Sequence, residues 1–272
     1  MLTDKHRCEN IFNDLDEIEQ QLSKRKYANL FLDFDGTIAP IAPSPDKVKI
    51  PAETLGILEK MCEYKHVFVA IITGRSFSDI KKIIPIKGIS FAANHGLEIS
   101  GMKRGEFIPN VSRLVRTVKR ISDDLNKVLL TVPGAWVENK SLTASVHYRT
   151  VPSSHIAELN RLVGEITVRY IEAGTIKLTR GKKVIEIWPN IAWHKGKAVR
   201  WMQKNIAKKR ASNVYIGDDE TDEDAFKVLN PALTVKVAQD VKVKTEAVYY
   251  VNNTTEVRFF LQWLLEKLAV LK

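Results

Sequence analysis

"LFLDFDGTIAP", residues 30–40, places two aspartates at the end of an apolar run and follows them directly with Gly-Thr. The apolar run predicts a buried strand, and side chains two residues apart on a strand point the same way. Asp33 and Asp35 are therefore expected on one face. Two carboxylates that close raise each other's pKa unless a cation lies between them. An oxygen-binding divalent ion such as Mg²⁺ is the natural counter-ion.

The segments around this stretch predict a parallel sheet. Residues 27–32, HVFVAII at 66–72 and GISFAANHG at 88–96 are apolar strands, separated by the helical stretches ETLGILEKMCEY and SFSDIKKII. Alternating strands and helices with nearly continuous apolar strands are typical of a sheet covered on both faces. We therefore expect an α/β fold with a doubly wound parallel sheet.

The pattern changes near residue 104 and returns near residue 185. Between them lie two helical stretches and several alternating strands, which indicate an inserted α+β domain. The predicted organisation is an N-terminal amphipathic helix in 1–26, a catalytic core in 27–103 and 185–272, and an inserted cap in 104–184.

The composition limits the classes of protein. The net charge is +10, and residues 103–210 hold 22 Lys and Arg against eight Asp and Glu, whereas the rest of the chain holds 20 against 24. This basic stretch is either a solvated face or a region that attracts an anionic ligand. Cys8 and Cys62 lie far apart without metal-ligand spacing, and the N-terminus resembles neither a secretory signal nor a transit peptide, so we expect a cytoplasmic protein with no membrane segment.

Three further strand or helix ends carry polar groups suited to phosphate chemistry. Thr73 ends the second apolar strand, and Gly74 lets backbone N–H groups approach an anion. Lys195 opens a helix in WHKGKA, and Asp218 and Asp219 follow the apolar strand NVYI. Because ligands bind at the carboxyl ends of parallel strands, these groups are expected to converge.

The combination of these groups predicts that the phosphoryl group is transferred first to a side chain of the protein. We expect Asp33 to attack phosphorus and form an aspartyl-phosphate. Asp35 would protonate the leaving alcohol and then activate the hydrolytic water. Thr73 and Lys195 would bind the phosphoryl oxygens and offset their developing charge.

The same residues predict the metal site. Mg²⁺ is expected on Asp33 and Asp218, with the backbone carbonyl of Asp35 as a further ligand. Asp219 is expected either as another ligand or as a residue that orients the ligands. Gly36 allows the turn after the strand, and Thr37 offers a hydroxyl and a backbone N–H to the substrate.

The order Asp-x-Asp-Gly-Thr, Thr-Gly-Arg, Lys, Gly-Asp-Asp resembles the haloacid dehalogenase (HAD) superfamily of phosphatases. The stretches DFDGTIAPI, ITGRS, NHGLEI, HYR, KVIEIWP, HKGKA and GDDETDEDAF resemble the trehalose-6-phosphate phosphatase family in particular. The resemblance covers residues 33–226 and implies a Rossmann-like core, a mobile inserted cap, and hydrolysis of trehalose 6-phosphate to trehalose and phosphate.

The resemblance also implies residues that contact the sugar. Glu186 would reach sugar hydroxyls from the cap with Lys182 beside it, and the pocket would be bordered by Arg75, His95, Glu98 and Arg149. The alternation around Glu186 equally predicts an outward-facing strand residue, and His95 is equally compatible with a buried histidine bonded to backbone. An association with the synthase that makes the substrate is left open.

Several other functions fit part of the pattern. The chain is also compatible with a HAD phosphatase for sucrose 6-phosphate or mannosyl-3-phosphoglycerate. A receiver domain that accepts a phosphoryl group lacks the second acid and the insertion. A nucleic-acid-binding protein would use the basic stretch, but aromatic residues do not interleave with its cations. A glycosidase would leave Lys195 and the second acidic cluster without a role.

Overall fold

The computed structural model describes residues 8–100, 111–229, 232–239 and 244–271. The chain divides into two compact units, a core unit (Met1–Gly101 and Trp193–Lys272) and an inserted unit (Met102–Ala192). The inserted unit ends later than the predicted 184, because strand β9 (Val184–Pro189) pairs with strands of that unit. Within the described residues, no helix has both the length and the apolar character needed to cross a bilayer.

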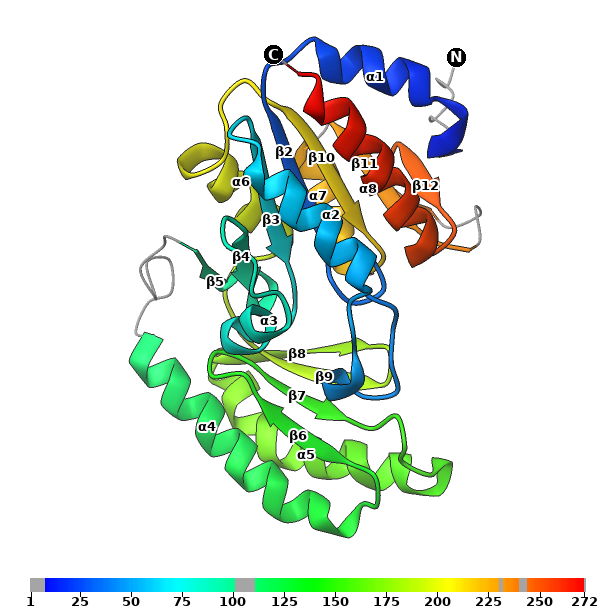
Figure 1. Ribbon diagram of the computed structural model, residues 1–272. Helices are drawn as coiled ribbons and strands as arrows, with labels where there is room; N and C mark the ends of the chain where they lie inside the picture. The colour runs from blue at the N-terminus through cyan, green and yellow to red at the C-terminus, as the bar shows by residue number, and fades with distance from the viewer. Residues whose placement is uncertain (1–7, 101–110, 230–231, 240–243, 272) are drawn as a thin grey trace, which may run out of the picture. The chain divides into compact units, whose positions relative to one another are not determined.

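The core unit contains an eight-stranded sheet in the order β1-β12-β11-β10-β2-β3-β4-β5. Its strands are parallel except β5, which pairs antiparallel with β4 at one edge. The predicted α/β class with a parallel sheet is confirmed (Figure 1). In chain order the strands are β1 Glu9–Asn10, β2 Ala28–Leu32, β3 Val67–Ile72, β4 Ser90–Ala93, β5 Glu98–Ile99, β10 Ser212–Gly217, β11 Leu233–Val237 and β12 Tyr249–Val251.

Helices cover both faces of this sheet. Along β2, Leu30 and Leu32 belong to the apolar cluster that includes residues of α1, α2, α3 and α8. Phe31 points the opposite way, towards the face where Tyr215 of β10 meets Phe226 of α7 edge to face. The helices are α1 Leu15–Ser23, α2 Ala52–Glu63, α3 Phe77–Ile83, α6 Lys195–Asn205, α7 Glu223–Leu229 and α8 Thr254–Ala269, with 3₁₀ turns η1 Ile11–Asn13, η2 Pro45–Lys47, η3 Asn94–Gly96 and η6 Glu220–Asp222.

The N-terminal segment is part of the core unit, and the predicted amphipathic helix within 1–26 is described over Leu15–Ser23, whereas residues 1–7 lie outside the described residues. Strand β1 pairs with β12, and the 3₁₀ turn η1 is capped by Asn10, whose side chain accepts from the Phe12 N–H. The helix begins only at Leu15, and Ile18 and Leu22 lie in the main apolar cluster. Burial of these apolar side chains against the sheet fixes the segment.

The predicted start of α3 is confirmed. Ser76 is the N-cap, and its hydroxyl accepts from the Asp79 N–H at 3.2 Å. This cap satisfies one of the backbone donors that a helix start leaves unpaired. It also fixes the turn that carries Thr73, Gly74 and Arg75 away from the end of β3.

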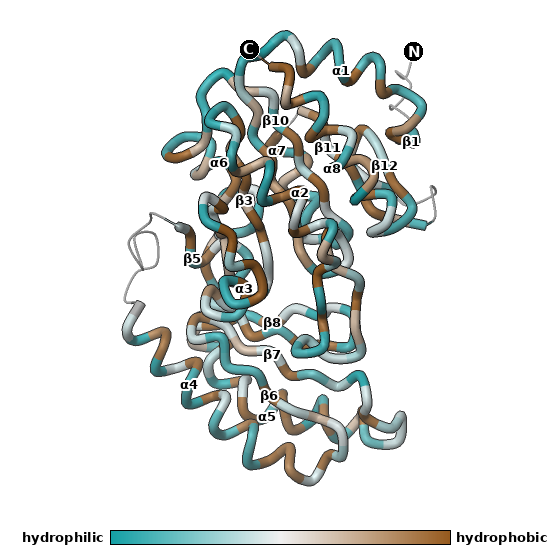
Figure 2. The backbone as a smooth tube through the Cα atoms, in the orientation of Figure 1, coloured by the Kyte–Doolittle hydropathy of each residue, from teal (hydrophilic) through white to brown (hydrophobic). Residues whose placement is uncertain are grey.

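The inserted unit is a four-stranded antiparallel sheet in the order β6-β7-β9-β8, with two long helices. Helix α4 alternates hydrophilic and hydrophobic residues (Figure 2), and Leu114, Val118, Ile121 and Leu125 form its buried side. The expected α+β class of the insertion is therefore observed. Its elements are α4 Val111–Val128, η4 Leu129–Thr131, β6 Trp136–Asn139, β7 Ala144–His147, η5 Ser153–His155, α5 Ile156–Glu172, β8 Ile176–Gly181 and β9 Val184–Pro189.

The packing of α6 on α7 gives a stability prediction. A Cβ added at Gly196 would clash with the backbone carbonyl oxygen of Asp224, whereas a Cβ at Gly56 in α2 would meet nothing within 4 Å. We expect Gly196→Ala to lower the free energy of unfolding by about 1–3 kcal/mol. The control Gly56→Ala should raise it by about 0.5–1 kcal/mol, because alanine loses less backbone entropy. Urea unfolding measures both, and equal stability of the two variants would contradict this packing.

Candidate active site

Two adjacent parallel strands bring the first acidic groups together. Residue Leu32 of β2 lies beside Ile216 of β10, and the Asp33 N–H donates to the Ile216 carbonyl oxygen at 2.9 Å. Asp33 and Asp218, which follow these strands, therefore share the carboxyl edge of the sheet. Gly36 lies against the Asp218 carboxylate with a φ of +87°, so a side chain at this position would clash with it and strain the backbone.

The carboxylates of Asp33, Asp218 and Asp222 form one acidic cluster. Oxygens of the three groups lie within 4.8 Å of one another, and Asp33 and Asp222 are buried. The hydroxyl of Thr37, one residue beyond Gly36, is buried without a hydrogen-bond partner among the described residues. Oxygen ligands of this kind suit a hard divalent cation, so the residues present fit a metal such as Mg²⁺.

Lys195, the first residue of α6, lies between two of these acids. Its ammonium donates to Asp33 Oδ1 and Asp222 Oδ1, both at 2.7 Å, and its side chain is only 3% exposed. Burial by itself lowers the pKa of Lys195, but the carboxylates of Asp222 and Asp33 outweigh burial and raise the pKa above its usual range. The ammonium is therefore charged near neutral pH.

Asp222 was not predicted as a site residue. Its Oδ1 accepts from Lys195 and from the Tyr215 hydroxyl at 2.7 Å, and its Oδ2 accepts from the Asp219 N–H at 2.9 Å. Two donors occupy Oδ1 and one occupies Oδ2, so Asp222 holds Lys195 in the cluster while its Oδ2 keeps one acceptor position. Asp222 lies four residues after Asp218, within a run of six acidic residues around Thr221. In the sequence, such a run is typical of a solvated surface.

Asp219 is placed differently from its predicted use as a metal ligand. Its carboxylate caps η6 and accepts from the Glu220 N–H at 2.7 Å, and it is absent from the acidic cluster found among the described residues. Its carbonyl oxygen accepts from Lys236 Nζ at 2.9 Å. These contacts favour the second predicted role, in which Asp219 shapes the turn that carries Asp218 and Asp222.

The electrostatics of Asp33 call for a cation. Burial raises the pKa of Asp33 well above its usual range, Asp222 and Asp218 raise it further, and Lys195 opposes the shift. One ammonium therefore does not balance the three acids. A divalent ion beside Asp33 and Asp218 would keep Asp33 ionised near neutral pH, as a nucleophile requires.

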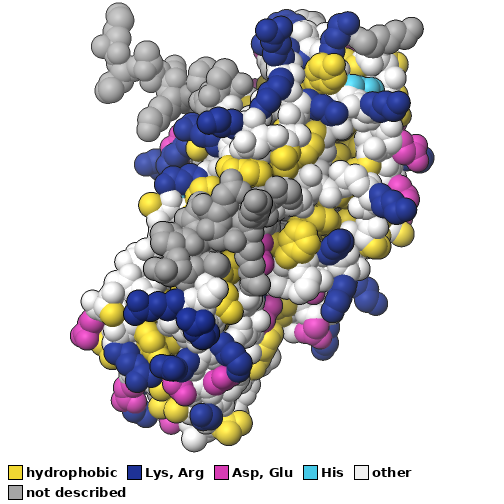
Figure 3. Space-filling view, turned by 90° about the vertical axis from the view of Figure 1, so that its left-hand side faces the viewer, with side chains coloured by type: hydrophobic (Ala, Val, Ile, Leu, Met, Phe, Trp, Pro, Cys, Tyr) yellow, Lys and Arg dark blue, Asp and Glu magenta, His cyan; other side chains and the backbone are white. Residues whose placement is uncertain are grey.

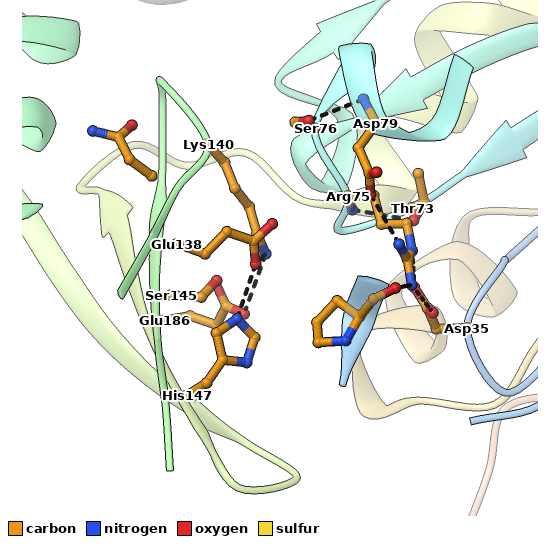
Figure 4. A network of polar contacts seen from close by, with 12 residues as sticks. Asp35, Thr73, Arg75, Ser76, Asp79, Glu138, Lys140, Ser145, His147 and Glu186 are labelled. Atoms are coloured by element: carbon orange, nitrogen blue, oxygen red, sulfur yellow. Dashed lines mark hydrogen bonds and ion pairs between the residues drawn. The ribbon is translucent and has the colours of Figure 1, made fainter. Parts of the chain in front are cut away.

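Asp35 is held by a two-bond ion pair. Arg75 Nε donates to Asp35 Oδ2 at 2.8 Å and Arg75 Nη2 donates to Asp35 Oδ1 at 2.7 Å (Figure 4). The guanidinium is buried, also donates to Asp79 Oδ2 and the Pro45 carbonyl oxygen, and lies 5.0 Å from the centre of the Phe34 ring. Arg75 was expected to border the substrate pocket, but the structure uses its donors on the protein and thereby fixes the plane of the Asp35 carboxylate.

The turn after β3 brings the remaining core residues together. Thr73 is buried, and its hydroxyl accepts from the Arg75 N–H at 3.1 Å. The His95 N–H donates to the Thr73 carbonyl oxygen at 2.7 Å, and the His95 ring lies against Gly74 where any side chain would clash. Glu98 accepts from the Asn94 amide at 2.7 Å. His95 and Glu98 therefore lie beside the turn that follows β3.

The inserted unit carries its own polar cluster on the face shared by β6, β7 and β9 (Figure 4). Glu186 accepts from Ser145 Oγ at 2.9 Å and lies 3.7 Å from Lys140 Nζ, which is also 3.7 Å from Glu138. Glu138 in turn contacts His147 Nε2 at 2.9 Å. Alternation in WVEN and ASVH was the available signal for Glu138, but only the strand pairing shows that it shares a face with Glu186.

Lys182 lies in the turn between β8 and β9, and Arg149, which follows β7, contacts that turn. Arg149 is exposed, and its Nη2 donates to the Lys182 carbonyl oxygen at 3.0 Å. This bond is to backbone, so it leaves other guanidinium donors of Arg149 for a ligand.

Comparison with known proteins places this geometry in a family. The profile of the trehalose-phosphatase family matches residues 31–263. Trehalose-phosphate phosphatase B of Arabidopsis thaliana is 33% identical over 96% of this chain and 72% of its own length. A solved trehalose-6-phosphate phosphatase related protein is 26% identical with a TM-score of 0.74, covering 88% of this chain and 97% of that one. The C-terminal domain of trehalose-6-phosphate phosphatase from C. albicans shares the fold, with a TM-score of 0.78 at 20% identity over 95% of this chain and 99% of that one.

The buried ammonium between two carboxylates gives a second stability prediction. Lys195→Met would leave Asp33 and Asp222 buried without their counter-ion. We expect the free energy of unfolding to fall by about 3–5 kcal/mol, because breaking a buried pair leaves uncompensated charge. The control Arg200→Met removes an exposed cation from the same helix and should change stability by less than about 0.5 kcal/mol. Urea unfolding in the presence of a chelator tests both, and a similar small change in both variants would show that Lys195 does not hold the cluster.

Proposed function

The chain belongs to the trehalose-phosphatase family, and we propose on that premise that it hydrolyses trehalose 6-phosphate to trehalose and phosphate. The observation that carries the proposal is the buried Asp33 between Lys195 and Asp218, at the carboxyl edge of the sheet. Burial and the fixed ammonium orient one carboxylate as a nucleophile for phosphorus.

In the proposed reaction, Asp33 Oδ2 attacks phosphorus while Oδ1 stays bonded to Lys195. The bond between phosphorus and the sugar oxygen breaks, and that oxygen takes a proton from Asp35. Asp35 then removes a proton from water, whose oxygen attacks the aspartyl-phosphate, and phosphate leaves with Asp33 regenerated. Each carboxylate oxygen of Asp35 has two acceptor positions, so its bonds to Arg75 leave room for this proton.

The remaining core residues stabilise charge in this proposal. Lys195 offsets the negative charge near Asp33, and the Thr73 and Thr37 hydroxyls and the backbone at Gly36 and Gly74 contact phosphoryl oxygens. Mg²⁺ bound by Asp33 and Asp218, with the Asp35 carbonyl oxygen, would supply charge neutralisation at the phosphoryl group. Asp222 acts through Lys195, because its oxygens bond Lys195, Tyr215 and the Asp219 N–H.

We assign sugar recognition to the polar cluster of the inserted unit, with Glu186 as its central acceptor. Lys140 and Ser145 hold Glu186, and Lys182 and Arg149 lie at the adjacent turn. A set of charged donors and acceptors on one sheet face suits a ligand rich in hydroxyl groups. His95 and Glu98 are proposed to border the substrate on the core unit.

We place the protein in the cytoplasm. Cys8 and Cys62 are both free thiols. Burial raises the pKa of each thiol to about 11, so both remain protonated and unreactive near neutral pH. Two unpaired thiols suit a reducing compartment.

A panel of phosphate esters tests the substrate. Phosphate release should be fastest, as kcat/KM, from trehalose 6-phosphate, compared with sucrose 6-phosphate and mannosyl-3-phosphoglycerate. A chelator should abolish release and added Mg²⁺ should restore it. A higher kcat/KM for another ester would contradict trehalose 6-phosphate as the substrate. Full activity in the presence of the chelator would contradict the requirement for a metal ion.

A change of leaving group should distinguish the role of Asp33 from the role of Asp35. Asp33→Asn should abolish release from both trehalose 6-phosphate and p-nitrophenyl phosphate, because no oxygen can attack. Asp35→Asn should slow release from trehalose 6-phosphate by about 10²–10⁴-fold. With p-nitrophenyl phosphate it should still give a burst of nitrophenolate, which leaves without a proton.

The control for this pair is Asp16→Asn, an exposed carboxylate in α1 that should leave turnover unchanged. Stopped-flow absorbance measures the burst. Equal losses with both esters in Asp35→Asn would argue against its role as an acid.

A further inference from the structure

A cavity of about 260 Å³ lies at the end of the core unit where β2 and β10 begin. It is lined by α1 and the residues after it, and by the first residues of β10 and β11: Ile18, Gln21, Leu22, Lys24, Arg25, Ala211, Ser212, Asn213 and Leu233. The acidic cluster follows the other ends of β2 and β10. About six residues of strand, or roughly 20 Å, separate the cavity from the acidic cluster. The cavity is therefore not part of the candidate active site.

Lys24 and Arg25 line this cavity, and Lys26, Lys208 and Arg210 follow or precede lining residues in the chain; we call these five cations the basic rim. They come from the turn after α1 and the turn after α6, which lie at the same end of the unit (Figure 1). The Ser212 N–H donates to the Tyr27 carbonyl oxygen, and Asn29 bonds both the N–H and the carbonyl oxygen of Lys208. These bonds hold the two turns side by side.

In the part of the chain that the structure describes, the basic rim forms no ion pair. Among the described residues, none of its five side chains lies within 4.0 Å of a carboxylate oxygen. Figure 3 shows Lys and Arg side chains at the top of the face that it presents, with others spread over the rest of that face. Like charges held together repel each other, and a bound anion relieves the repulsion.

The lining of the cavity indicates a small anion rather than a polymer. Ile18, Leu22 and Leu233 are buried and form its apolar part, whereas Arg25 offers a planar fork of donors that matches a phosphate group. The Asn213 amide oxygen already accepts from Asn29, which leaves its NH₂ group to donate. The cavity is partly open to solvent, and none of its described lining residues is aromatic, whereas single-stranded nucleic acid requires a surface of aromatic residues. Its volume suits a small molecule.

We propose that this cavity is a second ligand site, separate from the active site, which binds a small molecule carrying a phosphate group through Lys24 and Arg25. The phosphate meets the ammonium, the guanidinium and the Asn213 amide, and the remainder of the ligand lies over Ile18 and Leu22. Inorganic phosphate and a phosphate ester share this chemistry, so the experiment uses one of each.

Backbone-amide NMR of the full chain distinguishes the two sites. Titration with inorganic phosphate, and separately with glucose 6-phosphate, should shift the amides of residues 21–26 and of Ser212 and Asn213 in a saturable way. Shifts of residues 35–37 report the active site in the same spectra. Saturation by phosphate alone identifies the free ion, and saturation by the ester alone identifies an esterified ligand; both outcomes support the site.

Two variants complete the test. Lys24→Gln/Arg25→Gln should weaken binding at the cavity by at least roughly tenfold, through loss of two charge-assisted bonds. Turnover and the melting temperature should not change, because both side chains are exposed. Lys60→Gln/Lys87→Gln removes the same charge from exposed positions elsewhere on the core unit and should bind like the wild type.

Three results would overturn the proposal. These are no shift of the cavity amides with either compound at millimolar concentration, an equal shift in the Lys24→Gln/Arg25→Gln variant, or equal weakening in the Lys60→Gln/Lys87→Gln control. The last result would indicate general electrostatic attraction. If only an acidic peptide such as polyglutamate shifts the cavity amides, the site binds a protein partner and the proposal of a small ligand is wrong.

Discussion

The rest of the site depends on one interaction, the buried ammonium of Lys195 between Asp33 and Asp222. It joins the start of α6 to the end of β2 and to the turn after β10, three segments distant in sequence. Two acids and one cation leave net negative charge in a buried place, which destabilises the fold unless a further cation is bound. In the proposed function, the same imbalance would favour binding of a metal ion and would keep an oxygen of Asp33 ionised for attack on phosphorus. Stability and chemistry therefore make opposite demands on the same three side chains.

The ends of the buried strands can be predicted from the sequence, because a buried strand is a continuous run of apolar residues. The apolar runs before Asp33, Thr73 and Asp218 are long enough to identify parallel strands, and parallel strands align their carboxyl ends. The convergence of Asp33 and Asp218 follows from that rule, whereas Lys195 lies at the start of α6 and does not end a strand of this sheet. Asp222 was not predicted, because its acidic neighbours hide a fully buried carboxylate within what looks like a solvated run.

Sequence patterns do not predict which side chains of different turns contact each other. Arg75 and Asp35 are forty residues apart, and their ion pair depends on how the turn after β3 passes the turn after β2. A family resemblance places Arg75 near a substrate but cannot show that its donors are bonded to Asp35, Asp79 and Pro45. The polar cluster of the inserted unit has the same origin, since Glu138 and Glu186 share a face only through the pairing of β6, β7 and β9.

The active site and the basic rim lie at opposite ends of β2 and β10, and this arrangement limits what a ligand at the rim can do. Both strands are buried and hydrogen-bonded on both sides, so they are among the least deformable parts of the fold. A ligand that binds the folded state stabilises it in proportion to its occupancy, whatever the distance. An effect on turnover requires more, namely different affinities for two conformations of the enzyme. Rigid strands between the sites provide no such second conformation, so occupancy of the rim should act on the stability of the core unit and leave the rate of phosphoryl transfer unchanged.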